Sequence, residues 1–152
     1  MNKTFIDSNV IIYANDASDE QKQKIALAIV AEHMRLGTGV ISTQVLQEYA
    51  HVALNKLHQR QDVILRQLVL LEGLDVIPQS PVLIRRSVEI KATYQISFWD
   101  ACIISAAEHA KCNIILSEDL NSGQFYSGIA MENPFGSARR QGSDLRKSLI
   151  KK

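Results

Sequence analysis

Four acidic residues stand where a fold would bring them together. They are Asp7, Glu48, Asp100 and Asp119. Asp7 and Asp119 each follow a short apolar run, whereas Glu48 and Asp100 fall on the apolar faces of two predicted helices, where an unpaired charge is costly. Carboxylate oxygens are the ligands that Mg²⁺ and Mn²⁺ prefer, and a cation relieves the repulsion between neighbouring acids. We therefore expect a divalent metal site, whose ion would activate water and neutralise charge on a phosphate.

Three of the four acids also have an ordinary structural explanation. Asp7 precedes a predicted helix and suits an N-cap, and Asp119 lies in a polar segment where Asx-turns are common. Asp100 stands three residues after Ser97, close to a capping-box arrangement. Glu48 has valines three residues before it and four residues after it, so its carboxylate falls on an apolar stripe. A shared site explains the set of four better than four separate structural roles.

Other chemistries find less support in the sequence. No HExxH motif, Cys/His pair, glycine-rich phosphate loop or GxSxG elbow is present, which argues against zinc and against these phosphate and hydrolase sites. Tyr94, Phe98 and Trp99 are expected in the core rather than as a platform for nucleic-acid bases. Glu118 neighbours Asp119 in an extended segment, so we expect it to point the other way, as an outer support of the site or into solvent.

Composition indicates one ordinary domain. The chain has 152 residues, 46% of them hydrophobic and 22% charged, which is typical of a globular protein. Apolar runs such as Val10–Ala14 and Leu68–Leu71 fall short of the ~20 residues of a membrane span. We expect no signal peptide. Cys102 and Cys112 lack metal-ligand spacing and are expected to be free thiols in the cytoplasm, with a disulfide left open.

The net charge of +1 conceals an uneven distribution. Residues 137–152 contain six basic residues and one acidic residue, a net charge of +5, which leaves −4 for residues 1–136. We therefore divide the chain into a domain at 1–136 and a basic C-terminal tail at 137–152, expected to be flexible. The tail suits contact with phosphates, or is a solvated remnant; the two interpretations are evenly matched.

Hydrophobic periodicity predicts strands that alternate with helices. Strands are expected over residues 3–7, 40–42, 74–77, 114–117 and 129–132, and helices over 8–14, 19–36 with Ser18 as cap, 43–58, 62–72, 81–94 and 98–110. This order predicts an α/β fold with three α/β/α layers and a central, mostly parallel sheet. Functional residues of such sheets gather beyond the carboxyl ends of the strands, where Asp7 and Asp119 stand.

Four segments together resemble the PIN-domain family of metal-dependent ribonucleases, most closely its VapC-like toxin branch. The segments are FIDSNV at 5–10, STQVLQE at 42–48, SFWDA at 97–101 and ILSEDL at 115–120. A closing Asn133-Pro134-Phe135 adds to the likeness, which spans residues 3 to about 135. Each segment is weak alone, but their order and spacing are specific.

The resemblance implies hydrolysis of RNA phosphodiester bonds, with Asp7, Glu48, Asp100 and Asp119 as the catalytic quartet. Asp7, Asp100 and Asp119 would bind Mg²⁺, or alternatively Mn²⁺, and Glu48 or Asp100 would deprotonate or orient water. Asn9 and Ser117 would support the acids. The family further implies a homodimer and an antitoxin protein as partner.

Two alternatives remain beside the ribonuclease hypothesis. One is a non-catalytic RNA-binding or regulatory module of the same fold. The other is a phosphotransfer domain with Asp7 as nucleophile, which is disfavoured because the residue two positions later is Asn9 rather than a second acid.

Overall fold

Six strands form one sheet in the computed structural model, which describes residues 2–136. The strands are β1 (Thr4–Ile6), β2 (Gly39–Ser42), β3 (Asp75–Ile77), β4 (Ile114–Leu116), β5 (Phe125–Tyr126) and β6 (Ile129–Glu132). They lie in the order β3-β2-β1-β4-β6-β5, and every neighbouring pair is parallel except β5 with β6. The predicted central, mostly parallel sheet is confirmed.

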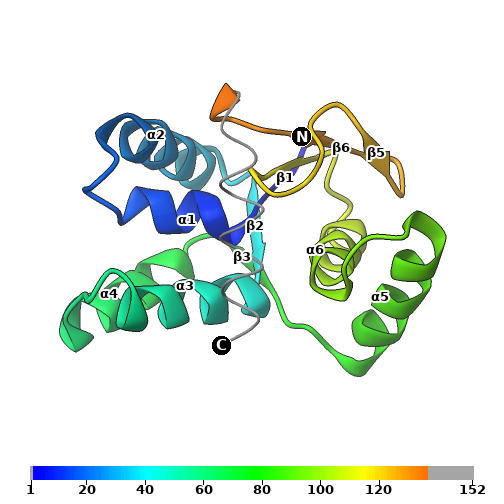
Figure 1. Ribbon diagram of the computed structural model, residues 1–152, viewed down its shortest axis with the longest axis horizontal. Helices are drawn as coiled ribbons and strands as arrows, with labels where there is room; N and C mark the ends of the chain where they lie inside the picture. Colours follow the sequence, from blue (N-terminus) through cyan, green and yellow to red (C-terminus); the bar gives the residue numbers. More distant parts are fainter. Residues whose placement is uncertain (1, 137–152) are drawn as a thin grey trace.

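Helices flank this sheet and complete the three layers that the sequence predicts. They are α1 (Ser8–Ala14), α2 (Glu20–Leu36), α3 (Thr43–Asn55), α4 (Gln61–Leu71), α5 (Pro81–Tyr94) and α6 (Phe98–His109). In Figure 1, α1 to α4 gather on one side and α5 and α6 on the other, with β1, β2 and β3 between them. The predicted basic tail, 137–152, lies outside the described residues.

Capping residues set the ends of several helices as predicted. Ser80 caps α5 by accepting a hydrogen bond from the Leu83 amide, and Pro81 occupies the first helical turn. Ser97 caps α6 in the same way. Gly37 ends α2 in the left-handed region, at φ 70°, a conformation that costs glycine little.

Three local predictions were wrong. The cap of α2 is Asp19 rather than Ser18, whose hydroxyl instead donates to Asp16 in the preceding turn. Helix α3 ends at Asn55, three residues early, and His58 adopts a left-handed conformation. Strand β5 was not predicted; it has only two residues, too few for a visible alternation.

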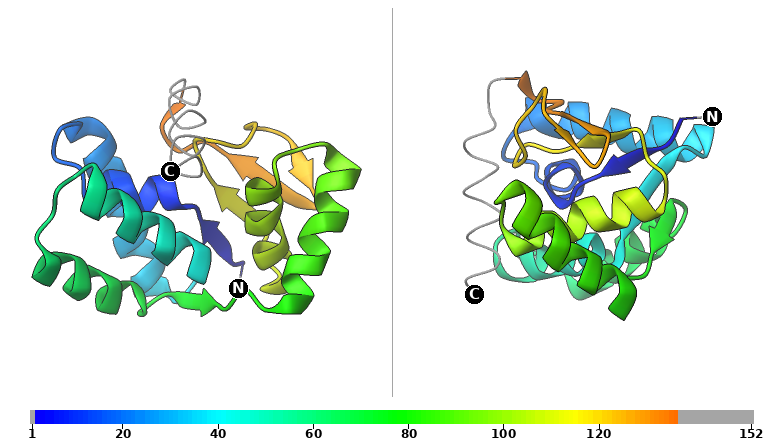
Figure 2. Two further views of the ribbon diagram at one scale, coloured as in Figure 1. Left: turned by 60° about the horizontal axis from the view of Figure 1, so that its bottom comes forward. Right: turned by 90° about the vertical axis from the view of Figure 1, so that its right-hand side faces the viewer.

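The core lies between the sheet and the helices. Every residue from Ala101 to Ala107 of α6 is buried, as are Phe5 and Ile6 of β1 and Ile115 of β4. Helices α5 and α6 lie side by side, as both views in Figure 2 show. Within residues 2–136, no helix is long and apolar enough to cross a membrane. Cys102 and Cys112 are both buried, and neither is in a disulfide.

The order of the strands creates a natural place for a site. From β1 the chain adds β2 and β3 on one side and later returns to add β4 on the other side. The direction of strand addition therefore reverses between β1 and β4. Functional sites of open α/β sheets lie at this reversal, beyond the carboxyl ends of the strands. Asp7 follows β1 and Ser117 follows β4, so both stand at this point.

Candidate active site

Asp7 is both a helix cap and a member of the predicted site. Its side chain is fully buried. Carboxylate oxygen Oδ1 accepts from the Ser8 amide at 2.7 Å, which begins α1, and Oδ2 accepts from the Ser117 hydroxyl at 2.7 Å. The Asp7 amide donates to the carbonyl of Leu116 at 3.0 Å and extends the pairing of β1 with β4. Its structural role as a cap thus coexists with a place in the site.

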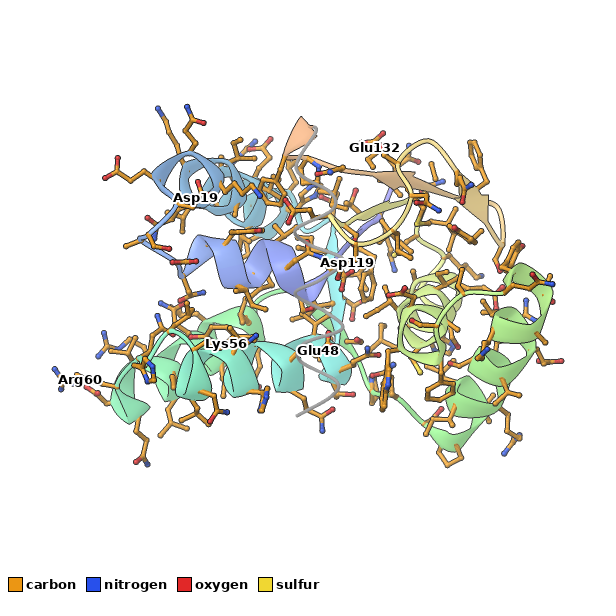
Figure 3. All side chains as sticks on the ribbon, viewed as in Figure 1. Asp19, Glu48, Lys56, Arg60, Asp119 and Glu132 are labelled. Atoms are coloured by element: carbon orange, nitrogen blue, oxygen red, sulfur yellow. The ribbon has the colours of Figure 1, made fainter. Side chains whose placement is uncertain are left out.

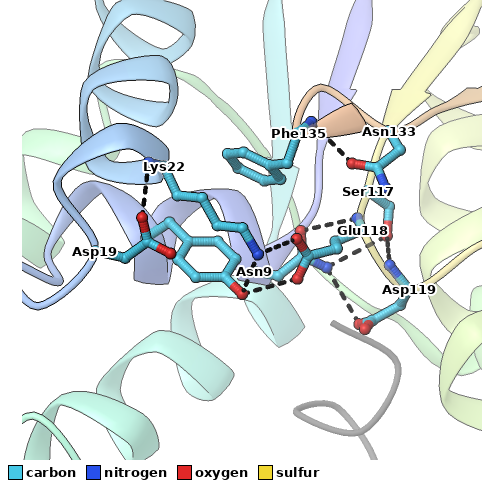
Figure 4. A network of polar contacts seen from close by, with 9 residues as sticks. Asn9, Asp19, Lys22, Ser117, Glu118, Asp119, Asn133 and Phe135 are labelled. Carbon is cyan, nitrogen blue, oxygen red and sulfur yellow. Dashed lines mark hydrogen bonds and ion pairs between the residues drawn. The ribbon is translucent and has the colours of Figure 1, made fainter. Parts of the chain in front are cut away.

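Asn9 and Ser117 hold the loop that carries Asp119. The Asn9 amide nitrogen Nδ2 lies 3.2 Å from Asp119 Oδ2 and 3.3 Å from Ser117 Oγ. Asn9 Oδ1 accepts from the Glu118 amide at 3.1 Å, and Ser117 Oγ accepts from the Asp119 amide at 3.0 Å (Figure 4). Asn9 and Ser117 therefore lie beside the acids that they were predicted to support. The Ser117 hydroxyl, rather than the Asp119 side chain, accepts the backbone hydrogen bond that closes this turn.

Glu48 reaches the same region from α3. The Ser8 hydroxyl donates to Glu48 Oε1 at 2.7 Å, and Gln44 Nε2 lies 3.5 Å from Glu48 Oε2. The side chain is half-buried, as its place on an apolar stripe predicted. Figure 3 places Glu48 on α3 and Asp119 above it, both near the centre of the molecule.

Asp100 lies in the first turn of α6, where its amide donates to Ser97 Oγ at 3.1 Å. Gln44 Nε2 also donates to the carbonyl of Trp99 at 3.2 Å, so one side chain of α3 contacts both Glu48 and the turn that carries Asp100. Sequence reasoning missed Gln44, which lies four residues before Glu48 on the same helix face.

Hydroxyl and amide donors join three of the predicted acids, Asp7, Glu48 and Asp119, and Gln44 ties the turn of Asp100 to them. Within the described residues, no three His, Cys, Asp or Glu side chains form a group compact enough to hold a metal ion. The acids are linked through their donors instead. All four offer carboxylate oxygen, so the chemistry of this donor set fits a hard cation such as Mg²⁺ or Mn²⁺.

Glu118 points away from Asp119, as predicted, but it is buried rather than solvent-exposed. Lys22 Nζ of α2 lies 2.7 Å from Glu118 Oε2, and the Tyr13 hydroxyl donates to Glu118 Oε1 at 2.8 Å (Figure 4). Lys22 Nζ also lies 3.2 Å from the Tyr13 oxygen. Burial, and then the bond to Glu118, raise the pKa of the Tyr13 hydroxyl well above its usual range.

The closing Asn133-Pro134-Phe135 segment covers this buried ion pair. The Phe135 ring meets the Tyr13 ring edge-on at 5.0 Å between centroids, and Lys22 Nζ lies 5.7 Å from the Phe135 centroid. Sequence reasoning missed Lys22 and Tyr13 as supports of the site. No local signal marks Lys22, because its partner Glu118 lies 96 positions later in the chain.

The aromatic residues beside Asp100 are more exposed than predicted. Trp99 exposes 42% of its surface and Tyr94 36%, whereas Phe98 is half-buried. Phe98 and Trp99 meet edge to face, with ring centroids 5.3 Å apart. Trp99 sits on the outer side of the first turn of α6, so the expectation that it belongs to the core was wrong.

Comparison with solved structures identifies chains of the same fold. The chain aligns with a toxin–antitoxin complex from Klebsiella pneumoniae at 19% identity and a TM-score of 0.64, over 88% of this chain and 98% of that chain. VapC20 from Mycobacterium tuberculosis, a sarcin–ricin loop cleaving toxin, aligns at 16% identity and a TM-score of 0.62, over 74% of this chain and 87% of that chain. DNA-bound VapBC from Salmonella typhimurium aligns at 16% identity and a TM-score of 0.65, over 88% of this chain and 99% of that chain.

No curated protein sequence matches the chain significantly. The profile of the PIN domain family, in contrast, matches residues 4–126. This range contains β1 and β4, the Asn9–Ser117 link and all four predicted acids. The chain therefore belongs to the PIN domain family.

Proposed function

We propose that this protein is an Mg²⁺- or Mn²⁺-dependent endoribonuclease and the toxin of a toxin–antitoxin pair. The observation that supports this most is the convergence of Asp7, Glu48 and Asp119 at the reversal point of the sheet, joined by Ser8, Asn9 and Ser117. Membership of the PIN domain family agrees with a nuclease. The fold is also that of VapC20, a sarcin–ricin loop cleaving toxin.

Asp7, Asp100 and Asp119 are the residues that would hold the metal. When bound, the ion would activate water and neutralise negative charge at the phosphate. The chain itself fixes the orientation of two of these groups: the Ser8 amide and the Ser117 hydroxyl hold both oxygens of Asp7, and Asn9 holds Asp119. Glu48 is kept near them by Ser8 and is a candidate for orienting or deprotonating the attacking water.

The proposed partners follow from the same comparison. The chains from Klebsiella pneumoniae and Salmonella typhimurium come from a toxin–antitoxin complex and a VapBC complex, respectively. We propose that an antitoxin protein holds this chain inactive and that the chain works as a homodimer in the cytoplasm. The two buried cysteines form no disulfide, which suits a reducing compartment.

The test is cleavage of total cellular RNA by the purified protein with Mg²⁺ or Mn²⁺, beside an EDTA control. Asp7→Asn should reduce the cleavage rate by about 100-fold or more, because it removes a charge aimed at the proposed metal. Asp75→Asn is the matched control, since Asp75 lies on the edge strand β3 with its side chain 55% exposed. Intact RNA with both metals, together with identical behaviour of Asp7→Asn in cells, would refute the proposal.

A non-catalytic RNA-binding module is the second candidate. It is favoured by the hydrogen bonds of Asp7, because both of its carboxylate oxygens already accept from donors of the chain. Thermal unfolding separates the two: a nuclease of this kind should be stabilised by Mn²⁺, and the module should not be.

A further inference from the structure

Trp99 lines a small pocket beside the proposed site. The pocket has a volume of about 250 Å³, and its lining includes Thr43, Gln44, Gln47, Gln79, Ile84 and Trp99. Pockets for drug-sized ligands span roughly 300–1,000 Å³, so this one suits a single planar group. An aromatic face combined with side-chain amides is the composition that recognises unpaired nucleic-acid bases.

The floor of this pocket is held rigidly. Gln79 Nε2 donates to Gln44 Oε1 at 3.0 Å, and the backbone amide of Gln44 donates to Gln79 Oε1 at 3.0 Å. Gln44 Nε2 in turn donates to the Trp99 carbonyl, and Phe98 meets the indole edge to face. These contacts fix the backbone of Trp99 and leave its ring 42% exposed. A preorganised surface loses little entropy when it binds a ligand.

The pocket adjoins the proposed catalytic acids. Gln44 contacts both Glu48 and the turn of Trp99, and Trp99 is the residue before Asp100. A phosphodiester placed at these acids would therefore carry a neighbouring base toward the indole. Gln47, exposed one residue before Glu48, offers an amide at the rim of the same pocket.

We propose that Trp99 and Gln47 form a subsite for one unpaired base of the RNA substrate, adjacent to the phosphate that is cleaved. The base stacks on the indole, and the Gln47 amide hydrogen-bonds to its edge. This inference rests on the proposed function and extends it, because it assigns Trp99 and Gln47 to recognition of the substrate. The paired Gln44 and Gln79 position the indole and do not read the base.

Trp99 is the sole tryptophan of the chain, so its fluorescence reports on this pocket alone. Short single-stranded oligoribonucleotides are titrated into full-length Asp7→Asn protein with Mg²⁺, and binding is measured in parallel by the anisotropy of labelled RNA. We expect saturable quenching whose midpoint matches the anisotropy, and no quenching by a blunt RNA duplex at the same concentrations.

Variants test the stacking itself by anisotropy. In the Asp7→Asn background, Trp99→Ala should weaken binding of single-stranded RNA by about 10-fold, since stacking on an aromatic side chain is worth roughly that much per base. Trp99→Phe should restore affinity to within about 3-fold, because it keeps an aromatic face. Phe125→Ala is the control: Phe125 is 68% exposed on β5, and its removal should leave affinity unchanged.

Two results would overturn the subsite. In one, wild-type protein cleaves RNA, yet the Trp99 fluorescence stays unchanged and Trp99→Ala binds RNA as before; the proposed function then stands without the subsite. In the other, Trp99 is shielded from acrylamide before RNA is added, and Trp99→Ala changes the oligomeric state, which would assign the indole to a contact between copies of the chain. Absence of both RNA cleavage and RNA binding would refute the proposed function and the subsite together.

Discussion

Two kinds of contact organise the acids of the site. Hydroxyl and amide groups of Ser8, Asn9 and Ser117 orient carboxylates that the proposed reaction uses. A cation, Lys22, holds Glu118, the acid that faces away from the site. Glu118 lies between Ser117 and Asp119 in the chain. Its side chain is held by Lys22 and its backbone amide by Asn9, so both contacts fix the loop that carries Asp119.

Removing the cation of this pair should destabilise the fold. Lys22→Met leaves Glu118 buried beside Tyr13 without its strongest partner, and breaking a buried pair in this way typically costs about 3–5 kcal/mol. Urea unfolding followed by circular dichroism measures the loss. Lys24→Met, an exposed lysine on the same helix, is the control and should change the free energy of unfolding by less than about 0.5 kcal/mol.

The double variant Lys22→Met/Glu118→Gln tests the cause. It should recover part of the lost stability, because the buried group that remains is neutral. Equal losses in the single and double variants would mean that Lys22 stabilises the protein by packing on the rings of Tyr13 and Phe135 rather than by its charge.

At the scale of elements, local signals predicted what local interactions determine. Helices α1 and α5 begin at the predicted residues because Asp7 and Ser80 are strong N-caps, and both helices also end where predicted. The cap of α2 was predicted wrongly because the Asp16–Ser18 turn competes for the serine hydroxyl. Contacts across the chain were out of reach of such signals, and the Lys22–Glu118 pair and the exposure of Trp99 depend on how the elements pack.

An ion pair joins α5 to α6, the two helices that lie side by side. Arg86 of α5 donates to both carboxylate oxygens of Glu108 on α6, at 2.8 and 2.9 Å. These hydrogen bonds lower the pKa of Glu108 below its usual value of 4.5. A lowered pKa means that the pair stabilises the folded state above pH 4.5, and that this contribution is lost as the pH falls through the pKa of the folded state.

Glu108→Gln should therefore reduce the free energy of unfolding by about 1 kcal/mol at pH 7, since the pair is partly exposed, and by less at pH 3. Chemical denaturation at both pH values measures the difference. The Glu32–Arg35 pair is the control: it has similar geometry, lies on α2 alone and is more exposed, so Glu32→Gln should cost less. A Glu108→Gln effect that does not shrink at low pH would contradict the assignment to charge.

Across the whole molecule, the stability should depend on the proposed metal. The acids gather beyond the carboxyl ends of the strands, and neighbouring carboxylates repel one another. Glu48→Gln should raise the melting temperature in EDTA by a few degrees, because it removes one charge and keeps an oxygen that can accept from Ser8. Differential scanning calorimetry measures the change, with Glu72→Gln, an exposed acid at the end of α4, as control.

Adding Mn²⁺ should make the melting temperature of the wild type higher than that of Glu48→Gln, because the wild type would bind the ion more tightly and gain more stability from it. A lower melting temperature of Glu48→Gln in EDTA would instead mean that the bond between Ser8 and the Glu48 carboxylate is structural.

The pairing of β1 with β4 has a consequence for synthesis of the protein. These strands are adjacent in the sheet but about 110 positions apart in the chain, as are the contacts of Asp7 with Ser117 and Asn9 with Asp119. Such distant contacts form late in folding. A nascent chain still inside the ribosome at residue 119 therefore carries Asp7 without Ser117 and Asn9 without Asp119, so the proposed site cannot assemble until nearly all of the domain has emerged.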